Sequence, residues 1–277
     1  MYKTIFTPLT VSDANPVELV YAAALSTAQN AHLDVLCLGI DRTPITYSEI
    51  GSNAFIMQNA IEEAHERANV IREHVETTLP LEAIRWECRS SVAPAGGVGR
   101  TVACQARFAD LAVVALPYAK GLPADASLVL ESLLFESDCP CIVVPPGQTS
   151  AQPESVVIAW NESDEALRAI RAAMPLLKAA NSVHIAIVDP PETGPERSDP
   201  GGALAVFLAR HDVRCDIQVM SRQGLGISDR LAHYVLETGS DMLVMGGYGH
   251  SRLREAVLGG ATRDMLEHST VPVLMAH

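Results

Sequence analysis

Two clusters of glycine in the C-terminal half of the sequence have the spacing of a ligand-binding loop. Residues 245–263 read MGGYGHSRLREAVLGGATR, with glycine at positions 246, 247 and 249 and again at 259 and 260. Glycine lets the backbone turn tightly and leaves its N–H groups uncovered, so that they can approach an anion. The second cluster opens a helical pattern at 261–269, and the N–H groups and dipole at a helix N-terminus also favour anions. We therefore expect the two clusters to face one polyphosphate from two sides.

The same stretch places positive charge on an otherwise acidic protein, through His250, Arg252, Arg254 and Arg263. The formal net charge of −13 argues against broad nucleic-acid binding. The glycine spacing does not match the dinucleotide fingerprint, and the G-K-[ST] of a Walker loop is absent. His250 either contacts phosphate when protonated or lies exposed at a helix start. Glycines that only serve turns and helix caps remain an alternative to the anion-binding interpretation.

The other reactive side chains form no catalytic or metal-binding pattern. The sequence has no G-x-S-x-G elbow and no H-E-x-x-H helix, and its nine histidines are scattered. The six cysteines show no C-x-x-C pair and no zinc-ligand spacing, and Cys139-Pro140-Cys141 is their one close pair in sequence. Buried free thiols in a cytosolic protein are the expected state of these residues. We predict no catalytic and no metal-ligating residues.

The elements that must position the glycines repeat along the chain. Four apolar runs recur in the same order: KTIFTP with SVVIAW (155–160), LDVLCLGID (33–41) with NSVHIAIVD (181–189), ADLAVVAL (109–116) with SDMLVMGG (240–247), and CPCIVVPP (139–146) with VPVLMAH (271–277). A fifth run in each half lies at 81–90 and 213–222. Short apolar runs bounded by Asp, Pro or Gly are typical of strands that are buried on both faces.

Helical patterns such as 164–180 and 228–240 alternate with these strands, as in βαβ units around a parallel sheet. The sequence therefore predicts an α/β fold of two tandem five-stranded parallel-sheet domains, at 1–147 and 152–277, joined by a Pro/Gly-rich linker within 145–155. The separation of Asp41 from Asp110 is 69 positions and that of Asp189 from Asp241 is 52, so the first half is about 17 residues longer. We place these residues in a long helix, 53–79, and the loop before it.

The glycine-rich stretch resembles the nucleotide loop of the universal stress protein family, whose ATP-binding members carry G-x-x-G, nine residues, then G-[ST]. Gly246, Gly249 and Gly259 fit that spacing. Because the resemblance extends over both halves, the chain looks like a tandem member of the family. The resemblance implies the Rossmann-like fold of the adenine-nucleotide α-hydrolase type.

Carrying the family's site onto this sequence gives a partial match. The acidic ribose contact after the first strand corresponds to Asn161, whose amide can bond a ribose hydroxyl but brings no charge. The backbone that holds adenine corresponds to Ile187. Gly260 stands where the family has Ser or Thr, which keeps a backbone donor and loses a hydroxyl. With His250, these residues complete the expected nucleotide site; Thr262 points elsewhere on the helix and is a doubtful substitute for the lost hydroxyl.

The equivalent loop of the first half, ALPYAKGLPADASLVLE, departs further from the motif. Ala115 and Tyr118 replace two motif glycines, and Pro117 removes a backbone donor. The glycines at 96, 97 and 99 precede a different helix and are interpreted as loop and cap. We conclude that the first half has lost the phosphate site.

The leading interpretation is a cytoplasmic stress-response protein that binds ATP or a related adenine nucleotide, with Mg²⁺ or Mn²⁺ as an accompanying ion, as a sensor or switch. Its alternatives are a nucleotide-free interaction module and a weak ATPase. The first residues lack the apolar stretch of a secretory signal and no run is long enough for a membrane span, so we expect no membrane partner. The apolar final strand of each half predicts an intramolecular pseudo-dimer; homodimerisation stays open.

Overall fold

The computed structural model of the chain describes residues 1–11, 16–43, 53–79, 84–118, 125–190, 198–248 and 260–277. Its contacts divide into two compact units, Met1–Ala115 with Lys120–Cys139 and Leu116–Ala119 with Pro140–His277. The second unit thus includes the last strand of the first half, whereas the predicted domain boundary, between 147 and 152, remains a prediction. Among the residues that the structure describes, each half of the chain supplies five strands, as the sequence predicts.

The first unit alternates strands and helices. Its strands are β1 (Thr4–Leu9), β2 (His32–Asp41), β3 (Arg85–Pro94) and β4 (Leu111–Ala115), in the spatial order β3-β2-β1-β4. Its helices are α1 (Val17–Gln29), α2 (Asn53–Thr78), α3 (Val98–Ala106) and α4 (Asp125–Glu136), with a short 3₁₀ turn at Ala95–Gly97. The paired strands β3-β2-β1-β4 are parallel.

The second unit repeats this pattern. Its strands are β5 (Cys141–Val144), β6 (Ser155–Ala159), β7 (Ser182–Val188), β8 (Asp216–Met220), β9 (Met242–Gly246) and β10 (Val273–Ala276), in the spatial order β5-β10-β9-β6-β7-β8. Its helices are α5 (Asp164–Leu177), α6 (Gly202–Ala209), α7 (Ile227–Thr238) and α9 (Ala261–His268). All of these strand pairs are parallel except β5 with β10.

The antiparallel pair joins the two strands that the sequence predicts to lie together. Val143 is opposite Val273, and Cys141 is opposite Met275. All side chains of both strands are buried, so that each strand covers an apolar edge of the other. The pairing agrees with the reason for expecting a pseudo-dimer, which itself remains a prediction.

An equivalent aspartate joins the first and fourth strands of each half. The Asp110 carboxylate accepts hydrogen bonds from the backbone N–H groups of Lys3 and Thr4, at 2.6 and 3.0 Å. The Asp241 carboxylate accepts from Glu154 and Ser155 in the same way, at 2.9 and 3.0 Å. Thr4 is therefore equivalent to Ser155, which moves the sequence alignment of KTIFTP with SVVIAW by one position.

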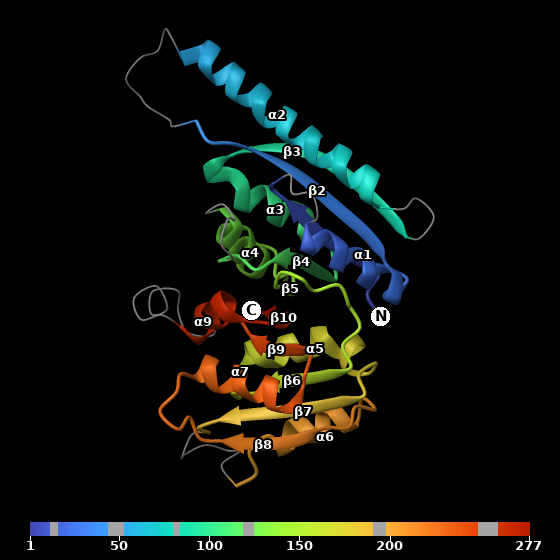
Figure 1. Cartoon of the computed structure of the whole chain (residues 1–277), viewed down its shortest axis with the longest axis vertical. Helices are drawn as coiled ribbons and strands as arrows, with labels where there is room; N and C mark the ends of the chain where they lie inside the picture. Colours follow the sequence, from blue (N-terminus) through green and yellow to red (C-terminus); the bar gives the residue numbers. More distant parts are fainter. Residues whose placement is uncertain (12–15, 44–52, 80–83, 119–124, 191–197, 249–259) are drawn as a thin grey trace. The chain divides into compact units, whose positions relative to one another are not determined.

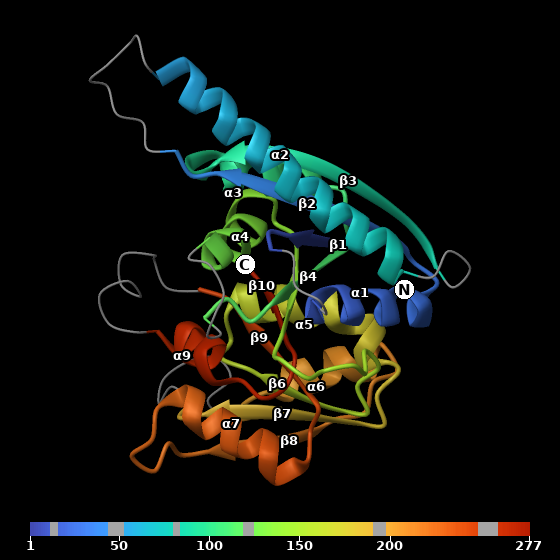
Figure 2. The ribbon, with the colours of Figure 1, turned by 45° about the horizontal axis from the view of Figure 1, so that its top comes forward.

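The predicted extra length of the first half is a long helix, α2, which lies along β2 and β3 (Figures 1 and 2). The β2–β3 ladder pairs ten residues and the β7–β8 ladder pairs five. A Cβ built on Gly39 of β2 would lie 1.9 Å from the backbone oxygen of Ala64. Glycine at this position lets the backbone of α2 approach the strand closely.

In the second unit, α6 and α7 cover opposite faces of the sheet (Figure 1). A Cβ built on Gly201, at the start of α6, would contact Ile187 and Ile185 of β7. His184, the neighbour of Ile185 in β7, points to the opposite face of the sheet. Its ring packs edge-on against Tyr234 of α7, with ring centroids 6.3 Å apart. The side chains of β7 therefore alternate between the two helical layers.

Candidate functional site

The carboxyl ends of β6, β7 and β9 meet at one edge of the second sheet. Ala159 at the end of β6 is paired with Ala186 of β7 on one side and with Met245 of β9 on the other. Because β6 is followed in the chain by β7 but has β9 as its other neighbour, the strand order reverses direction here. Open parallel sheets bind ligands beyond the carboxyl ends of strands at such a switch point.

The turn from β6 into α5 carries Asn161. Its side-chain oxygen accepts a hydrogen bond from the backbone N–H of Ser163 at 3.2 Å, and its side chain is exposed. The Ser163 hydroxyl in turn accepts from the backbone N–H of Ala166 and caps α5. The turn is thus held by local side-chain bonds that leave Asn161 at the surface of the sheet edge.

Trp160, directly before this turn, is buried, yet its indole nitrogen has no hydrogen-bond partner within the described part of the chain. Its backbone N–H donates to the carbonyl of Ala186 at 2.9 Å, which extends the β6–β7 ladder to the start of the turn. Buried donors normally have a partner, so an unpaired one beside a sheet edge is a feature that a ligand or a water could explain. No motif in the sequence points to this tryptophan.

Ile187 lies in β7 opposite Val219, with its side chain 4% exposed. Two residues on, Asp189 follows the end of the strand. Its carboxylate accepts from the Arg222 guanidinium at 2.5 Å, and this hydrogen bond lowers the pKa of Asp189 below its usual value. The Asp189 carboxylate is therefore committed to an ion pair, and Ile187 can offer only its backbone and its aliphatic surface.

Gly246 ends β9 against the first turn of α5. A Cβ built on it would lie 2.6 Å from the backbone nitrogen of Ala166 and 3.0 Å from Cβ of Glu165. Real Cβ atoms do not approach backbone so closely, so this glycine is required by the packing of the strand end on the helix. For Gly246 the architectural interpretation of the motif is supported, whether or not a ligand also uses the position.

The loop after β9 is bonded to the start of α9. The backbone N–H of Tyr248 donates to the buried Thr262 hydroxyl at 3.3 Å. Gly247 donates to the Ala276 carbonyl at 2.9 Å and accepts from the His277 ring at 3.1 Å. The two ends of the glycine-rich stretch are therefore adjacent, and the interpretation of Thr262 as a residue that simply points elsewhere needs correction: it points into the loop after β9.

Helix α9 begins at Ala261, and its N-cap residue is Gly260. Gly260 is extended, with φ −81° and ψ 153°, and as a glycine it has no side chain that could accept from the first-turn N–H groups. These groups are directed out of the helix N-terminus, as an anion site requires. Gly249, His250, Gly259, Arg252 and Arg254 lie outside the described residues.

Arg263, in the first turn of α9, is already engaged by two neighbours. Its Nε donates to the Glu267 carboxylate at 2.9 Å, and its guanidinium lies 5.2 Å from the centroid of the Tyr118 ring. The bond to Glu267 raises the pKa of Arg263, so the side chain is a cation whose charge is largely compensated. Arg263 adds less positive charge to the site than the sequence predicts.

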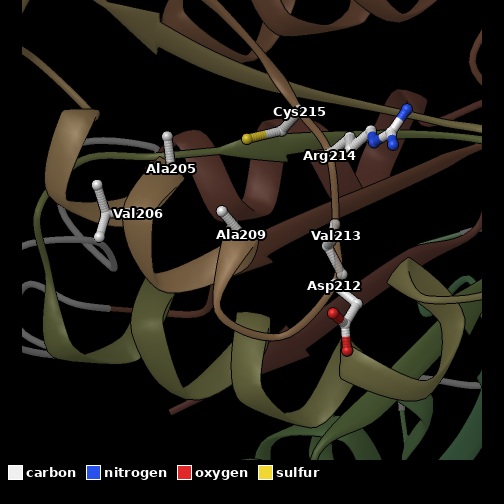
Figure 3. Close-up of a pocket in the computed structure, with 7 residues that line it drawn as sticks. All are labelled: Ala205, Val206, Ala209, Asp212, Val213, Arg214 and Cys215. Atoms are coloured by element: carbon white, nitrogen blue, oxygen red, sulfur yellow. The ribbon is translucent and has the colours of Figure 1, made fainter.

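Two other features of the described residues lie away from this edge. Figure 3 shows a hollow between α6 and the start of β8, lined by Ala205, Val206, Ala209, Asp212, Val213, Arg214 and Cys215. None of its lining residues is a predicted site residue. On β2 and β3, His32, Asp34 and Glu87 lie close together. Two nitrogen atoms of the Arg89 guanidinium donate hydrogen bonds to the Glu87 carboxylate. Arg89 thus compensates the negative charge of Glu87.

No helix among the described residues is at once long and apolar enough to cross a bilayer. Residues 153–277 match the Universal stress protein family. A universal stress protein of Synechocystis sp. is 24% identical over 147 residues, which cover 52% of this chain and 49% of the relative. The match thus spans about half the length of that curated relative.

Two crystal structures share the fold over nearly the whole chain. A universal stress protein from Archaeoglobus fulgidus is 16% identical with a TM-score of 0.69, covering 99% of this chain and 95% of its own. A protein from Pseudomonas aeruginosa is 13% identical with a TM-score of 0.60, covering 99% and 92%. The α/β fold with a large, mostly parallel sheet is therefore the fold of these proteins. Residues 153–277 thus match the universal stress protein family, and the chain as a whole has the fold of these proteins.

Proposed function

We propose that the C-terminal domain, residues 152–277, binds ATP or a related adenine nucleotide, and that this cytoplasmic protein uses the nucleotide as a sensor or switch in the stress response. The observation that carries the proposal is the hydrogen bond from Tyr248 N to Thr262 Oγ1. It holds the loop after β9 against the start of α9, so that the two glycine clusters can face one polyphosphate. The match of residues 153–277 to the universal stress protein family supports this proposal.

The described residues fit such a ligand in two further respects. The N-cap residue of α9, Gly260, has no side chain to cap the first-turn N–H groups, and the buried Trp160 indole N–H has no partner among the described residues. Both are donors, and a nucleotide is rich in acceptors. Asn161 and the backbone of Ile187 lie at the same edge, where ribose and adenine are proposed to bind. A divalent ion, Mg²⁺ or Mn²⁺, would be held mainly by the phosphates and by water.

A nucleotide-free interaction module is the second candidate, and the packing of Gly246 favours it. The contact of this glycine with the first turn of α5 gives one motif glycine a purely structural reason. If each glycine of the motif has such a reason, no ligand is needed to explain the spacing. A weak ATPase is the third candidate; it would need the same bound nucleotide.

The test is to denature the purified full-length protein and to identify the released nucleotide by absorbance and mass. We expect an adenine nucleotide from the wild type and much less from Thr262→Val, which leaves the Tyr248 N–H without its acceptor. Thr7→Val is the matched control, because Thr7 is also a buried threonine, bonded to the Val113 carbonyl at 2.9 Å in the first unit. This control should release as much nucleotide as the wild type.

Wild-type protein that releases no nucleotide, and that also fails to bind added ATP, would favour the interaction module. Phosphate release that scales with protein and disappears in Thr262→Val would support the weak ATPase. Equal loss of nucleotide from both threonine variants would indicate general destabilisation, and the bond between Tyr248 and Thr262 would then have no particular role in binding.

A further inference from the structure

Two thiols meet beneath α2 in the first unit. The Sγ atoms of Cys37 on β2 and Cys88 on β3 lie 3.3 Å apart. The residues are 51 positions apart in the sequence and diagonal neighbours in the ladder, because Cys37 is paired with Ser90 and Val35 with Cys88. Cys37 is fully buried and Cys88 is partly exposed. The contact therefore has one accessible sulfur and one protected sulfur.

Hydrogen bonding makes the two sulfurs chemically different. The hydrogen bond between the two sulfurs lowers the pKa of Cys88 and, together with burial, raises the pKa of Cys37, so Cys37 is the donor when Cys88 is a thiolate. Two charged side chains of α2 act on the Cys88 thiol: Glu76 raises its pKa, and Arg72 lowers it to a smaller extent. Arg72 also forms an ion pair with Glu76, with 3.8 Å between its Nε and the carboxylate. Cys88 thus has two features of a nucleophilic thiolate: partial exposure and a neighbouring hydrogen-bond donor.

The other cysteines lie in different surroundings. Burial raises the pKa of Cys139 to about 12, and burial also raises the pKa of Cys215. Cys104 is exposed and accepts a hydrogen bond from the Arg107 guanidinium at 3.1 Å. Because Cys104 is exposed and has a cation beside it, it is a stringent internal reference for the rate at which a surface thiol of this protein reacts.

We propose that Cys37 and Cys88 form a redox modification site that reacts with hydroperoxides and closes to a disulfide. In the first step, the Cys88 sulfur attacks the distal peroxide oxygen. The O–O bond breaks, Cys88 becomes a sulfenic acid, and an alcohol or water leaves with a proton. In the second step, the Cys37 sulfur attacks the Cys88 sulfur. The S–O bond breaks, and the leaving hydroxide takes the Cys37 proton and departs as water.

The balance is closed, because the two thiols lose two electrons and two protons and the peroxide is reduced. To form the bond, the sulfurs must approach from 3.3 Å to the disulfide length of about 2.05 Å. A thiol reductant reverses the second step by exchange. The site is distinct from the proposed nucleotide site, since both cysteines belong to the first unit.

The experiment treats reduced full-length protein with hydrogen peroxide and follows each cysteine by peptide mass mapping. We expect a Cys37–Cys88 cross-link in the wild type, formed before Cys104 is oxidised, and reversal by dithiothreitol. Cys104→Ser is the matched control and should form the same cross-link at the same rate. In Cys37→Ser the reaction should stop at a Cys88 sulfenic acid that dimedone traps.

Cys37→Ala removes the donor that Cys37→Ser keeps, so trapping at Cys88 should be slower in the alanine variant, on the order of tenfold. Oxidation of Cys104 while Cys37 and Cys88 stay reduced would overturn the proposal. The wild-type map alone decides the question if the substituted proteins do not fold. Equal trapping rates in the serine and alanine variants would contradict the role of the Cys37 hydrogen bond.

Discussion

The loop after β4 and the loop after β9 begin alike and then diverge. In the first, the backbone N–H of Leu116 donates to the Val144 carbonyl at 3.0 Å; in the second, Gly247 donates to Ala276 at 2.9 Å. The next residue is Pro117 in one loop and Tyr248 in the other. Tyr248 uses its N–H to bond Thr262, and proline has none to offer.

The acceptor has changed together with the donor. Thr262 is ten residues before Pro272, and the residue ten before Pro140 is Leu130, which is buried and apolar. The first half therefore lacks both groups of the bond that holds the loop to the helix. A single substitution would not restore this hydrogen bond. For this reason we expect the first half to bind no phosphate.

The first half also differs from the second at the start of the helix that follows this loop. Helix α4 begins at Asp125, fifteen residues before Pro140, whereas α9 begins eleven residues before Pro272. Asp125 forms an ion pair with Arg42, directly after β2, at 2.5 Å. A carboxylate in the first turn of α4 is placed where an anion would be favoured. Helix α9 also has a carboxylate in its first turn, Asp264, so the difference between the repeats at this point is the ion pair of Asp125 with Arg42.

The largest expected effect concerns packing at the two strand ends. Gly246→Ala places a Cβ against the backbone of α5, and we expect the free energy of unfolding to fall by about 1–3 kcal/mol, the usual cost of overpacking. Ala115→Gly is the counterpart in the first half and should cost about 0.5–1 kcal/mol, through backbone entropy. Urea unfolding measures both. A Gly246→Ala protein as stable as the wild type would remove the structural reason for this glycine.

The next prediction addresses the phosphate loop. Gly249→Val adds a branched side chain where the family motif requires glycine, and we expect ATP affinity to fall at least about tenfold, roughly 1.4 kcal/mol. Calorimetry measures the affinity, and a urea titration shows that the sheet still folds. A folded variant that binds ATP normally would mean that the loop does not approach the phosphates.

A smaller gain is expected at the helix start. Gly260→Ser restores the family hydroxyl at the N-cap of α9 and should strengthen ATP binding by about 0.5–1.5 kcal/mol, the net worth of one hydrogen bond. Because serine is also a good N-cap, a stability gain of a few tenths of a kcal/mol should accompany it. Leu128→Ser, twelve residues before Pro140 as Gly260 is before Pro272, is the control and should leave ATP binding unchanged.

The smallest expected effect is at Tyr118. Tyr118→Gly should leave ATP affinity unchanged, since Pro117 remains and no second glycine cluster is present in the first half. It removes the ring beside Arg263, at a cost in stability of about 0.5–1 kcal/mol for an exposed cation–π pair. Tyr118→Phe keeps the ring and serves as the control. A change of ATP affinity in the glycine variant alone would show that the ring holds Arg263 in a position that binding requires.

Much of the fold could be predicted because its signals are local. The apolar runs became strands, and the helical patterns at 53–79, 164–180 and 228–240 became α2, α5 and α7, with Gly239 ending α7 at a positive φ of 63°. The run at 81–90 missed the end of β3 at Pro94, because the long neighbouring β2 extends the ladder.

The rest of the candidate site depends on neighbours that are distant in sequence. Tyr248 and Thr262 are 14 positions apart, and Cys37 and Cys88 are 51 apart. The sequence indicates only Cys139 and Cys141 as a close pair, because a single sequence shows which cysteines are near each other along the chain and not which meet in the fold. The sequence also could not show why position 246 is a glycine, because the contact that requires it is with α5, which is distant in sequence.

The central claim is that the chain binds one adenine nucleotide, in its C-terminal domain. Isothermal titration of nucleotide-free full-length protein with ATP tests it most directly. We expect a stoichiometry of one ATP per chain, with binding weakened in Gly249→Val and unaffected in Arg42→Ala, which breaks the ion pair between Arg42 and Asp125. A stoichiometry of two, or no binding by folded wild-type protein, would contradict it.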